Sequence, residues 1–145
     1  MNKTTIHNCQ RISLPKIEDR RGNLSVIEGD VLPYAIKRVY YLYDVPSNAS
    51  RGGHAHIDQV ECLIALSGSF SVVLDDGTHT TTQLLNKPDQ GLIIPKGIWR
   101  SLDDFSSGSV CLVLSSGEFD ETDYIRNYAD FLAFKGTDTP AQAQQ

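Results

Sequence analysis

The stretch Arg51-Gly52-Gly53-His54-Ala55-His56, followed by Glu61, dominates the interpretation of this 145-residue chain. On an extended segment alternate side chains point to the same side, so His54 and His56 are expected to enter one cavity about 7 Å apart. The apolar run at 62–66 that follows them is typical of a buried strand. An imidazole has an unperturbed pKa of about 6.5 and exchanges protons near neutral pH. We therefore expect a pair of histidines on a β-strand that faces an interior pocket.

Short extended segments separated by turn residues make up most of the chain. The clearest is the run at 35–43, which is rich in β-branched and aromatic residues and places Arg38 and Tyr40 on one face. Asp75-Asp76-Gly77 is the strongest hairpin signal. The expected strands are 11–17, 24–28, 35–43, 51–56, 62–66, 70–74, 78–85, 92–94, 98–102 and 109–114. Strands with turns about every 8–12 residues predict an all-β fold, an antiparallel sandwich or barrel.

Only the C-terminal part has a helical pattern. The residues Asp120-Glu121-Thr122-Asp123 are expected to cap a helix that continues through Arg126, and 128–134 to form a second short helix. Residues 136–145 contain Pro, Ala and Gln and predict a disordered tail. The length fits one domain, which we place at 1–135.

Composition excludes several classes of partner. The chain has 13 basic and 18 acidic residues, a net charge of −5 that disfavours nucleic-acid binding. No run approaches the ~18 apolar residues of a membrane span, and the polar start does not resemble a signal peptide. Cys62 and Cys111 lie in apolar runs and are expected to be buried, while Cys9 is isolated; this odd count argues against disulfides and a thiolate zinc site. We expect a cytoplasmic protein without nucleic-acid or membrane partners.

The spacing His-x-His-x4-Glu-x6-Gly, which begins at His54, resembles the first motif of the cupins, β-barrels of the jelly-roll type. The residues Gly91-x3-Pro95-x-Gly97 resemble the start of the second motif. The resemblance implies a metal bound by three histidines and a glutamate, but Arg100 stands where a metal cupin carries a histidine. A guanidinium has no lone pair to offer and repels a divalent cation. His54, His56 and Glu61 remain an alternative three-ligand metal site.

Without a metal, the histidines are free to carry protons, which suits a substrate with an acidic C–H beside a carbonyl. Tyr40 would supply a hydrogen bond from the neighbouring strand. The basic candidates are Arg21, Arg38, Arg51 and Arg100. Arginine forks at turns of an acidic protein suit a diphosphate. Trp99 and Tyr40, each taken alone, are more typical of a core than of a site.

Several longer runs resemble the dTDP-sugar 3,4-ketoisomerases, metal-free cupins of the deoxysugar pathways. The runs are Ile36-Lys37-Arg38-Val39-Tyr40-Tyr41, Arg51-Gly52-Gly53-His54-Ala55-His56, Leu74-Asp75-Asp76-Gly77, Phe105-Ser106-Ser107-Gly108-Ser109-Val110-Cys111-Leu112-Val113-Leu114 and Asp120-Glu121-Thr122-Asp123-Tyr124-Ile125-Arg126. The resemblance covers roughly 12–134. It implies a dTDP-4-keto-6-deoxyglucose substrate, a 3-keto product, no cofactor and a homodimer with exchanged N-terminal strands, in pathways toward lipopolysaccharide or S-layer glycans.

The resemblance also implies catalytic roles for His54, His56 and Tyr40. A 4-keto group acidifies the C3 hydrogen, so a base can form an enediolate that is then protonated at C4. We expect His54 to move the carbon-bound proton, while His56 and Tyr40 handle the protons on oxygen. The expected substrate-binding residues are Arg21, Arg38, Arg51, Glu61, Trp99 and Arg100.

Two positions depart from the family pattern and keep alternatives open. Glu61 stands where a glutamine is expected, and a carboxylate there would raise the pKa of a histidine or restore some metal affinity. Arg100 stands where some relatives carry histidine and is expected to influence which face of C4 is protonated, so the galacto and gluco products both remain open. The other two hypotheses are a metal-dependent cupin enzyme using His54, His56 and Glu61, and a non-catalytic cupin that binds sugar nucleotides.

Overall fold

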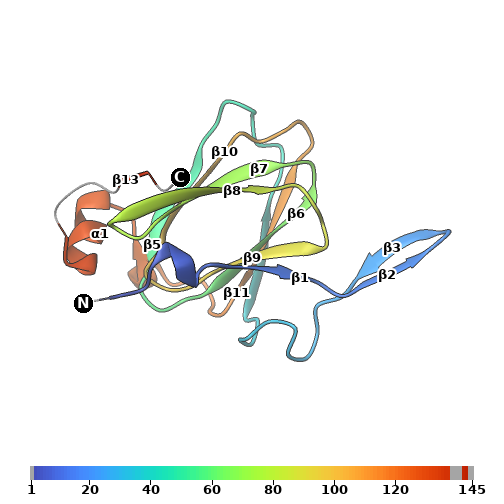
Figure 1. The fold of residues 1–145 in the computed structure, drawn as a ribbon, viewed down its shortest axis with the longest axis horizontal. Coiled ribbons are helices and arrows are strands. Elements are labelled where there is room, and N and C mark those ends of the chain that lie inside the picture. Colours follow the sequence, from blue (N-terminus) through green and yellow to red (C-terminus); the bar gives the residue numbers. More distant parts are fainter. Residues whose placement is uncertain (1, 138–141, 144–145) are drawn as a thin grey trace.

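The computed structural model describes residues 2–137 and 142–143 and shows two facing β-sheets with a helix at one end (Figure 1). The five-stranded sheet contains, in spatial order, β1 (Gln10–Ser13), β9 (Gln90–Ile94), β6 (Glu61–Ser67), β11 (Val110–Ser115) and β4 (Arg38–Leu42). The six-stranded sheet contains β12 (Tyr124–Ile125), β5 (Arg51–His56), β10 (Trp99–Asp103), β7 (Phe70–Asp75), β8 (His79–Leu85) and β13 (Gln142–Ala143). Within these two sheets the strands pair antiparallel, except for β13 on β8. The predicted all-β fold is confirmed.

Two short helical turns and one α-helix complete the described part of the chain: η1 (Ile6–Asn8), η2 (Glu121–Asp123) and α1 (Tyr128–Lys135). The helix predicted through Arg126 is wrong, because after one turn of η2 the chain becomes extended and pairs with β5 as β12. The second predicted helix is confirmed as α1, which begins at an Asn127 cap and ends at a left-handed Gly136. Of the predicted disordered tail at 136–145, residues 138–141 and 144–145 lie outside the described residues, whereas Gln142–Ala143 form β13.

Apolar side chains from both sheets fill the space between them. This core contains Ile6, Leu63, Ala65, Phe70, Val72, Leu74, Leu85, Leu92, Ile94, Ile98, Leu102, Phe105, Cys111 and Val113. A second cluster on the outer face of the five-stranded sheet includes Cys62 and Ile64, which are covered by Leu14 and Leu32. Strand β6 is therefore buried on both faces along residues 61–65, and its sequence is continuously apolar from 62 to 66 rather than alternating. The predicted burial of Cys62 and Cys111 is confirmed.

Helix α1 covers the outer face of the six-stranded sheet near β5 and β10. Phe131 and Leu132 pack there against Ala55, with Trp99 at the border of the cluster. The end of the sheet that carries the histidines is thus closed from outside. None of the helices among the described residues is long and apolar enough to cross a membrane.

A two-stranded hairpin, β2 (Lys16–Asp19) and β3 (Gly22–Ser25), extends away from the two sheets (Figure 1). All of its residues are exposed. Ile17 and Leu24 lie directly opposite each other in the ladder and therefore on the same face of the ribbon. The hairpin presents apolar surface to solvent, which a two-stranded ribbon cannot bury by itself.

Candidate active site

A cavity of about 380 Å³ lies between the two sheets and is lined from both of them. Its lining combines ionisable and aromatic side chains with aliphatic ones. The lining residues are Tyr40, Leu42, Ser50, Arg51, His54, Glu61, Leu63, Arg100, Leu102, Val113, Tyr124 and Arg126. A cavity of this size, mostly apolar but with a few converging polar groups, is typical of a small-molecule site.

A bulge in β5 brings Arg51 to the same side as His54. Across the β5–β10 ladder, Arg51 pairs with Leu102 and His54 pairs with Arg100. Three residues of β5 therefore advance while β10 advances by two, which is the geometry of a β-bulge at Gly52-Gly53. Gly53 has a φ of +28°, which residues with a side chain rarely adopt, so glycine suits this position. The bulge explains why Arg51 and His54, three residues apart, both line the cavity.

The two histidines of β5 are in direct contact. His54 Nε2 lies 3.2 Å from His56 Nε2, and their rings meet edge to face. Only His54 lines the cavity; His56 is completely buried. The two histidines lie together as predicted, but His56 communicates with the cavity only through its contact with His54.

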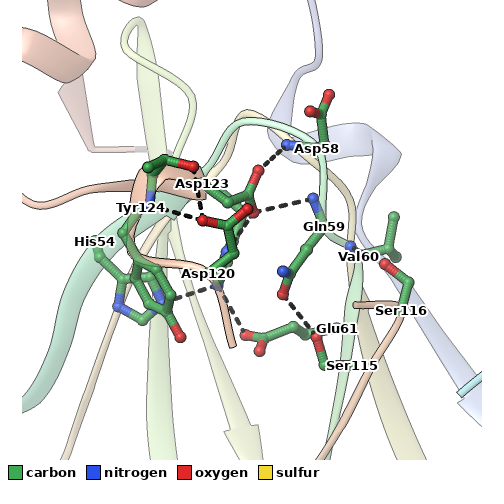
Figure 2. Close-up of polar contacts among 12 residues, drawn as sticks. His54, Asp58, Gln59, Val60, Glu61, Ser115, Ser116, Asp120, Asp123 and Tyr124 are labelled. Carbon is green, nitrogen blue, oxygen red and sulfur yellow. Dashed lines mark hydrogen bonds and ion pairs between the residues drawn. The ribbon is translucent and has the colours of Figure 1, made fainter. Parts of the chain in front are cut away.

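Asp123, at the end of η2, holds the other side of His56. Its Oδ2 lies 2.9 Å from His56 Nδ1. The same carboxylate accepts the backbone N–H groups of Asp58, at 2.7 Å, and Gln59, at 3.2 Å (Figure 2). The ring of Tyr124, the next residue, packs on His56 with centroids 4.5 Å apart. The η2–β12 segment thus fixes the buried histidine from two directions.

Glu61 is the centre of a buried charge network on the opposite sheet. Its Oε1 accepts a hydrogen bond from Arg100 Nη1 at 2.8 Å and lies 3.4 Å from His56 Nε2. Its Oε2 accepts the Tyr40 hydroxyl at 2.7 Å. Arg38 Nη2 approaches the same oxygen at 3.6 Å. One carboxylate therefore connects the histidines to the strand tyrosine and to two guanidinium groups.

This network shifts the acidities of its members. Burial pushes the pKa of Glu61 upward, but the hydrogen bond to His56 and the charge of Arg100 outweigh it and leave that pKa at about 2. Burial, reinforced by the negative charge of Glu61, raises the pKa of Tyr40 well above its usual value. At neutral pH the pocket therefore contains an ionised glutamate and a tyrosine that keeps its proton.

Most predicted site residues converge, and two do not. Arg38 lies beside the cavity, where it donates to Gln59 and Tyr124. Trp99 was expected at the substrate, but alternation along β10 turns Arg100 inward and Trp99 outward, against Phe131. Arg21 was also expected there, but it lies on the hairpin turn, where it pairs with Asp19 at 2.7 Å and does not reach the cavity of its own chain.

Asp123, Tyr124 and Arg126 belong to the site but were not predicted from the sequence. All three fall in the segment that was predicted to be a helix, so no strand pairing with β5 was expected. Arg126 stacks over Tyr124, with its guanidinium carbon 4.2 Å from the ring centroid. A useful signal was available in the sequence, since extended residues 124–126 carry alternating aromatic, branched and basic side chains typical of an edge strand.

The only candidate metal ligands grouped together within the described residues are His54, His56 and Glu61, whose ligand atoms lie within 4.8 Å of one another. Both oxygens of Glu61 already accept hydrogen bonds, one of them from the Arg100 guanidinium. A divalent cation bound there would face that positive charge at close range. The donor set does not fit a resident metal while Arg100 occupies this corner.

Comparison with known sequences places the chain among sugar isomerases. The family model FdtA, described as WxcM-like, C-terminal, matches residues 7–136. The curated TDP-4-oxo-6-deoxy-alpha-D-glucose-3,4-oxoisomerase of Aneurinibacillus thermoaerophilus is 44% identical over 121 residues, which cover 83% of this chain and 87% of that protein.

Solved structures agree with this result. The 3,4-ketoisomerase QdtA from Thermoanaerobacterium thermosaccharolyticum, as a mutant in complex with TDP-4-keto-6-deoxyglucose, has a TM-score of 0.88 at 39% identity and covers 90% of this chain and 96% of its own. The WlaRB TDP-quinovose 3,4-ketoisomerase from Campylobacter jejuni has a TM-score of 0.84 at 44% identity, with 88% and 99% covered. The WlaRA TDP-fucose-3,4-ketoisomerase from the same organism has a TM-score of 0.84 at 34% identity, with 88% and 96% covered. These relatives confirm the cupin-like β-fold.

Proposed function

We propose a reaction for this chain, which belongs to the FdtA family of TDP-sugar 3,4-ketoisomerases: it moves the carbonyl of TDP-4-keto-6-deoxyglucose from C4 to C3. The observation that carries this proposal is the buried imidazole pair, with Nε2 atoms 3.2 Å apart and one ring lining a cavity of about 380 Å³. Such a pair can take a proton from one carbon and return it to the next.

The reaction balances without an added reactant. A base removes the C3 hydrogen as a proton, and its electron pair forms the C3–C4 double bond of an enediolate. A proton is then delivered to C4, and the hydroxyl proton passes from O3 to O4, which leaves the carbonyl at C3. His54 moves the carbon-bound proton, because it is the histidine that lines the cavity.

Arg100 stabilises the negative charge that develops on the two oxygens, and Tyr40 holds a substrate hydroxyl. The Tyr40 hydroxyl donates to Glu61 and lines the cavity, so its lone pairs are available to a substrate hydroxyl. Arg100 lies opposite His54 in the strand ladder and adds a fixed positive charge beside the reacting carbons. Because Glu61 holds both groups, it positions them without having to touch the sugar.

The nucleotide diphosphate has candidate partners among the cavity residues. Arg51 and Arg126 both line the cavity, and their guanidinium groups suit a pyrophosphate. In the free protein Arg126 pairs with Glu121 at 2.6 Å, so phosphate oxygens would take the place of a carboxylate. Binding of TDP should therefore weaken as salt concentration rises, which titration calorimetry at several ionic strengths measures.

Product analysis tests the proposed reaction. The protein is incubated with TDP-4-keto-6-deoxyglucose, and the carbonyl position is followed by ¹³C NMR. We expect the carbonyl signal to move from C4 to C3, and proton couplings at C4 to give the galacto or gluco configuration. If the sugar binds but remains unchanged, the proposed reaction is wrong and the non-catalytic binding hypothesis is supported.

The same assay after chelation addresses the metal-dependent alternative. Because Arg100 occupies the corner beside the candidate ligands, we expect protein dialysed against EDTA to keep its rate. Metal analysis of the untreated protein is the control. A stoichiometric transition metal whose removal abolishes turnover would contradict the proposed chemistry.

The chain is further proposed to act as a homodimer that exchanges its N-terminal strands. Supporting this, the hairpin exposes Ile17 and Leu24 on one face, away from its own sheets. A second apolar surface lies on the outer face of β4, where Val39 and Tyr41 are exposed, and continues to the exposed Tyr43 just after the strand. Exposed apolar patches of this kind mark protein interfaces, and a second copy supplies both surfaces. All three cysteines are free thiols, which supports a reducing, cytoplasmic setting.

A further inference from the structure

We propose that Asp123 is a positioning residue of the isomerisation: it holds His56 with Nδ1 protonated, so that Nε2 is directed at His54 and the proton can be shared between the two rings. This inference rests on the proposed ketoisomerase function. It names a residue outside the cavity lining that acts on the substrate only through the two histidines.

The first step concerns the carboxylate itself. Asp123 is almost fully buried, and each of its oxygens accepts a backbone N–H: Oδ1 from Asp58 at 2.7 Å and Oδ2 from Gln59 at 3.2 Å (Figure 2). Backbone N–H groups can only donate, so both oxygens act as acceptors. The side chain is thus fixed in orientation by groups that cannot reverse their roles.

The second step concerns the imidazole. His56 Nδ1 lies 2.9 Å from Asp123 Oδ2, and an acceptor oxygen at that distance requires a proton on the nitrogen. His56 has no exposed surface, so no water can replace this partner. The tautomer of a buried histidine is set by the bond that its other nitrogen makes. Nδ1 is therefore the protonated nitrogen when the ring is neutral, and the hydrogen bond from Nε2 to Glu61 forms when the ring is charged.

The third step concerns the proton that moves. His56 Nε2 lies 3.2 Å from His54 Nε2 and 3.4 Å from Glu61 Oε1. Two nitrogens at this distance share one proton, and a carboxylate behind one ring stabilises the imidazolium when that ring takes the proton. Asp123 thereby lets the pair accept the C3 proton without leaving the positive charge on the ring that faces the sugar.

Replacing Asp123 with asparagine tests this with almost no change in shape. The amide turns one acceptor oxygen into a donor, which then faces either the backbone N–H of Asp58 or the protonated nitrogen of His56. Either the backbone bond is lost or the imidazole must adopt its other tautomer. We expect Asp123→Asn to lower kcat by about 10²–10⁴-fold and to change KM by no more than a few-fold.

A spectroscopic readout separates positioning from general structural damage. ¹⁵N NMR of the histidine-labelled, substrate-free protein reports which ring nitrogen carries a proton. We expect Nδ1 of His56 to be protonated in the wild-type protein, and the Nε2–H tautomer to appear in Asp123→Asn. Asp120→Asn is the matched control, since it makes the same change three residues earlier at the exposed cap of η2, where asparagine caps equally well.

The outcomes are distinct. A wild-type kcat for Asp123→Asn, or an unprotonated Nδ1 on His56 of the wild-type protein, would overturn the inference. If circular dichroism shows that Asp123→Asn does not fold, the protonation of His56 Nδ1 in the wild-type protein alone tests the inference. If the wild-type protein does not isomerise the sugar, the proposed function fails, and the tautomer measurement still reports whether Asp123 sets the ring.

Discussion

The pocket and the β2–β3 hairpin depart from the usual distribution of polar and apolar residues in opposite directions. The pocket buries charges, with Arg100 and Glu61 each only 1% exposed. The hairpin exposes apolar side chains, with Ile17 at 61% and Leu24 at 56% exposed. Buried charges must be paired within the chain, whereas exposed apolar side chains can be covered only from outside it. The first region is self-contained, whereas the second leaves its apolar face open to the proposed second copy.

The largest effect is expected from removing the histidine that lines the pocket. His54→Asn should lower kcat by about 10²–10⁴-fold, because no other imidazole reaches the cavity among the described residues. TDP affinity should stay within a few-fold, since the arginines are untouched. The measurement is steady-state kinetics with calorimetric TDP binding. His79→Asn, at an exposed histidine on β8, is the control, and a His54→Asn rate equal to wild type would disprove the role.

Two ion pairs of equal length allow the stabilities contributed by buried and exposed charges to be compared directly. Arg100–Glu61 in the pocket and Lys16–Glu18 on the hairpin both measure 2.8 Å. Arg100→Met leaves the Glu61 carboxylate buried beside fewer partners and should cost about 3–5 kcal/mol of unfolding free energy. Lys16→Met, at the exposed pair, should leave the unfolding free energy nearly unchanged.

Urea denaturation measures both changes. Combining Arg100→Met with Glu61→Gln should recover part of the loss, since the unpaired charge is then gone. Equal losses of unfolding free energy in Arg100→Met and Lys16→Met would contradict the assigned burial of the Arg100–Glu61 pair.

Acid should remove the stability that the ionised Glu61 contributes to the pocket. The pKa of Glu61 is about 2 in the folded protein, against 4.5 for an ordinary glutamate, so its ionisation stabilises the fold above about pH 4.5. The contribution is about 3 kcal/mol and is lost as pH falls from about 4.5 toward 2. The stability gap between wild type and Glu61→Gln should close over that range in urea titrations. A gap that does not change with pH would show that Glu61 titrates normally.

The hairpin is tested through its apolar face. Because Leu24 lies opposite Ile17 on one exposed face, Leu24→Glu should weaken the proposed dimer by about 10-fold or more, given that burial of one leucine contributes about 1.5–3 kcal/mol. Sedimentation equilibrium should give about twice the 16.0 kDa chain mass for wild type and a lower value for the variant. Leu84→Glu, at an exposed leucine on β8, should remain dimeric. A wild-type protein of 16.0 kDa would exclude the dimer.

Alternation and turn chemistry predicted most of the strands, although the run 11–17 is divided between β1 and β2, and motif spacing placed His54, Glu61 and Arg100 in one region. The errors share one cause, which is that the side a residue faces depends on partners distant in sequence. The predicted position of Trp99 was wrong because side chains alternate along β10, and Arg100, the next residue, faces the cavity instead. Asp123 was missed because the pairing of β12 with β5 overrides the local helix-capping pattern.

The hairpin could not be placed from sequence for a different reason. The turn between the predicted strands 11–17 and 24–28 is a local signal, but the direction in which the ribbon leaves the sheets depends on what it packs against. The described residues offer no packing partner for Ile17 or Leu24 comparable to the core between the sheets. Local chemistry therefore predicts that the hairpin exists, whereas the position of Arg21 relative to a cavity would depend on the proposed dimer.

The central claim is that the histidine pair carries a proton from C3 to C4 of the sugar. The most direct test is to run the isomerisation in D₂O and examine the product by NMR. Because ring N–H groups exchange with solvent, we expect a 3-keto sugar with deuterium at C4. An unchanged 4-keto sugar would contradict the claim.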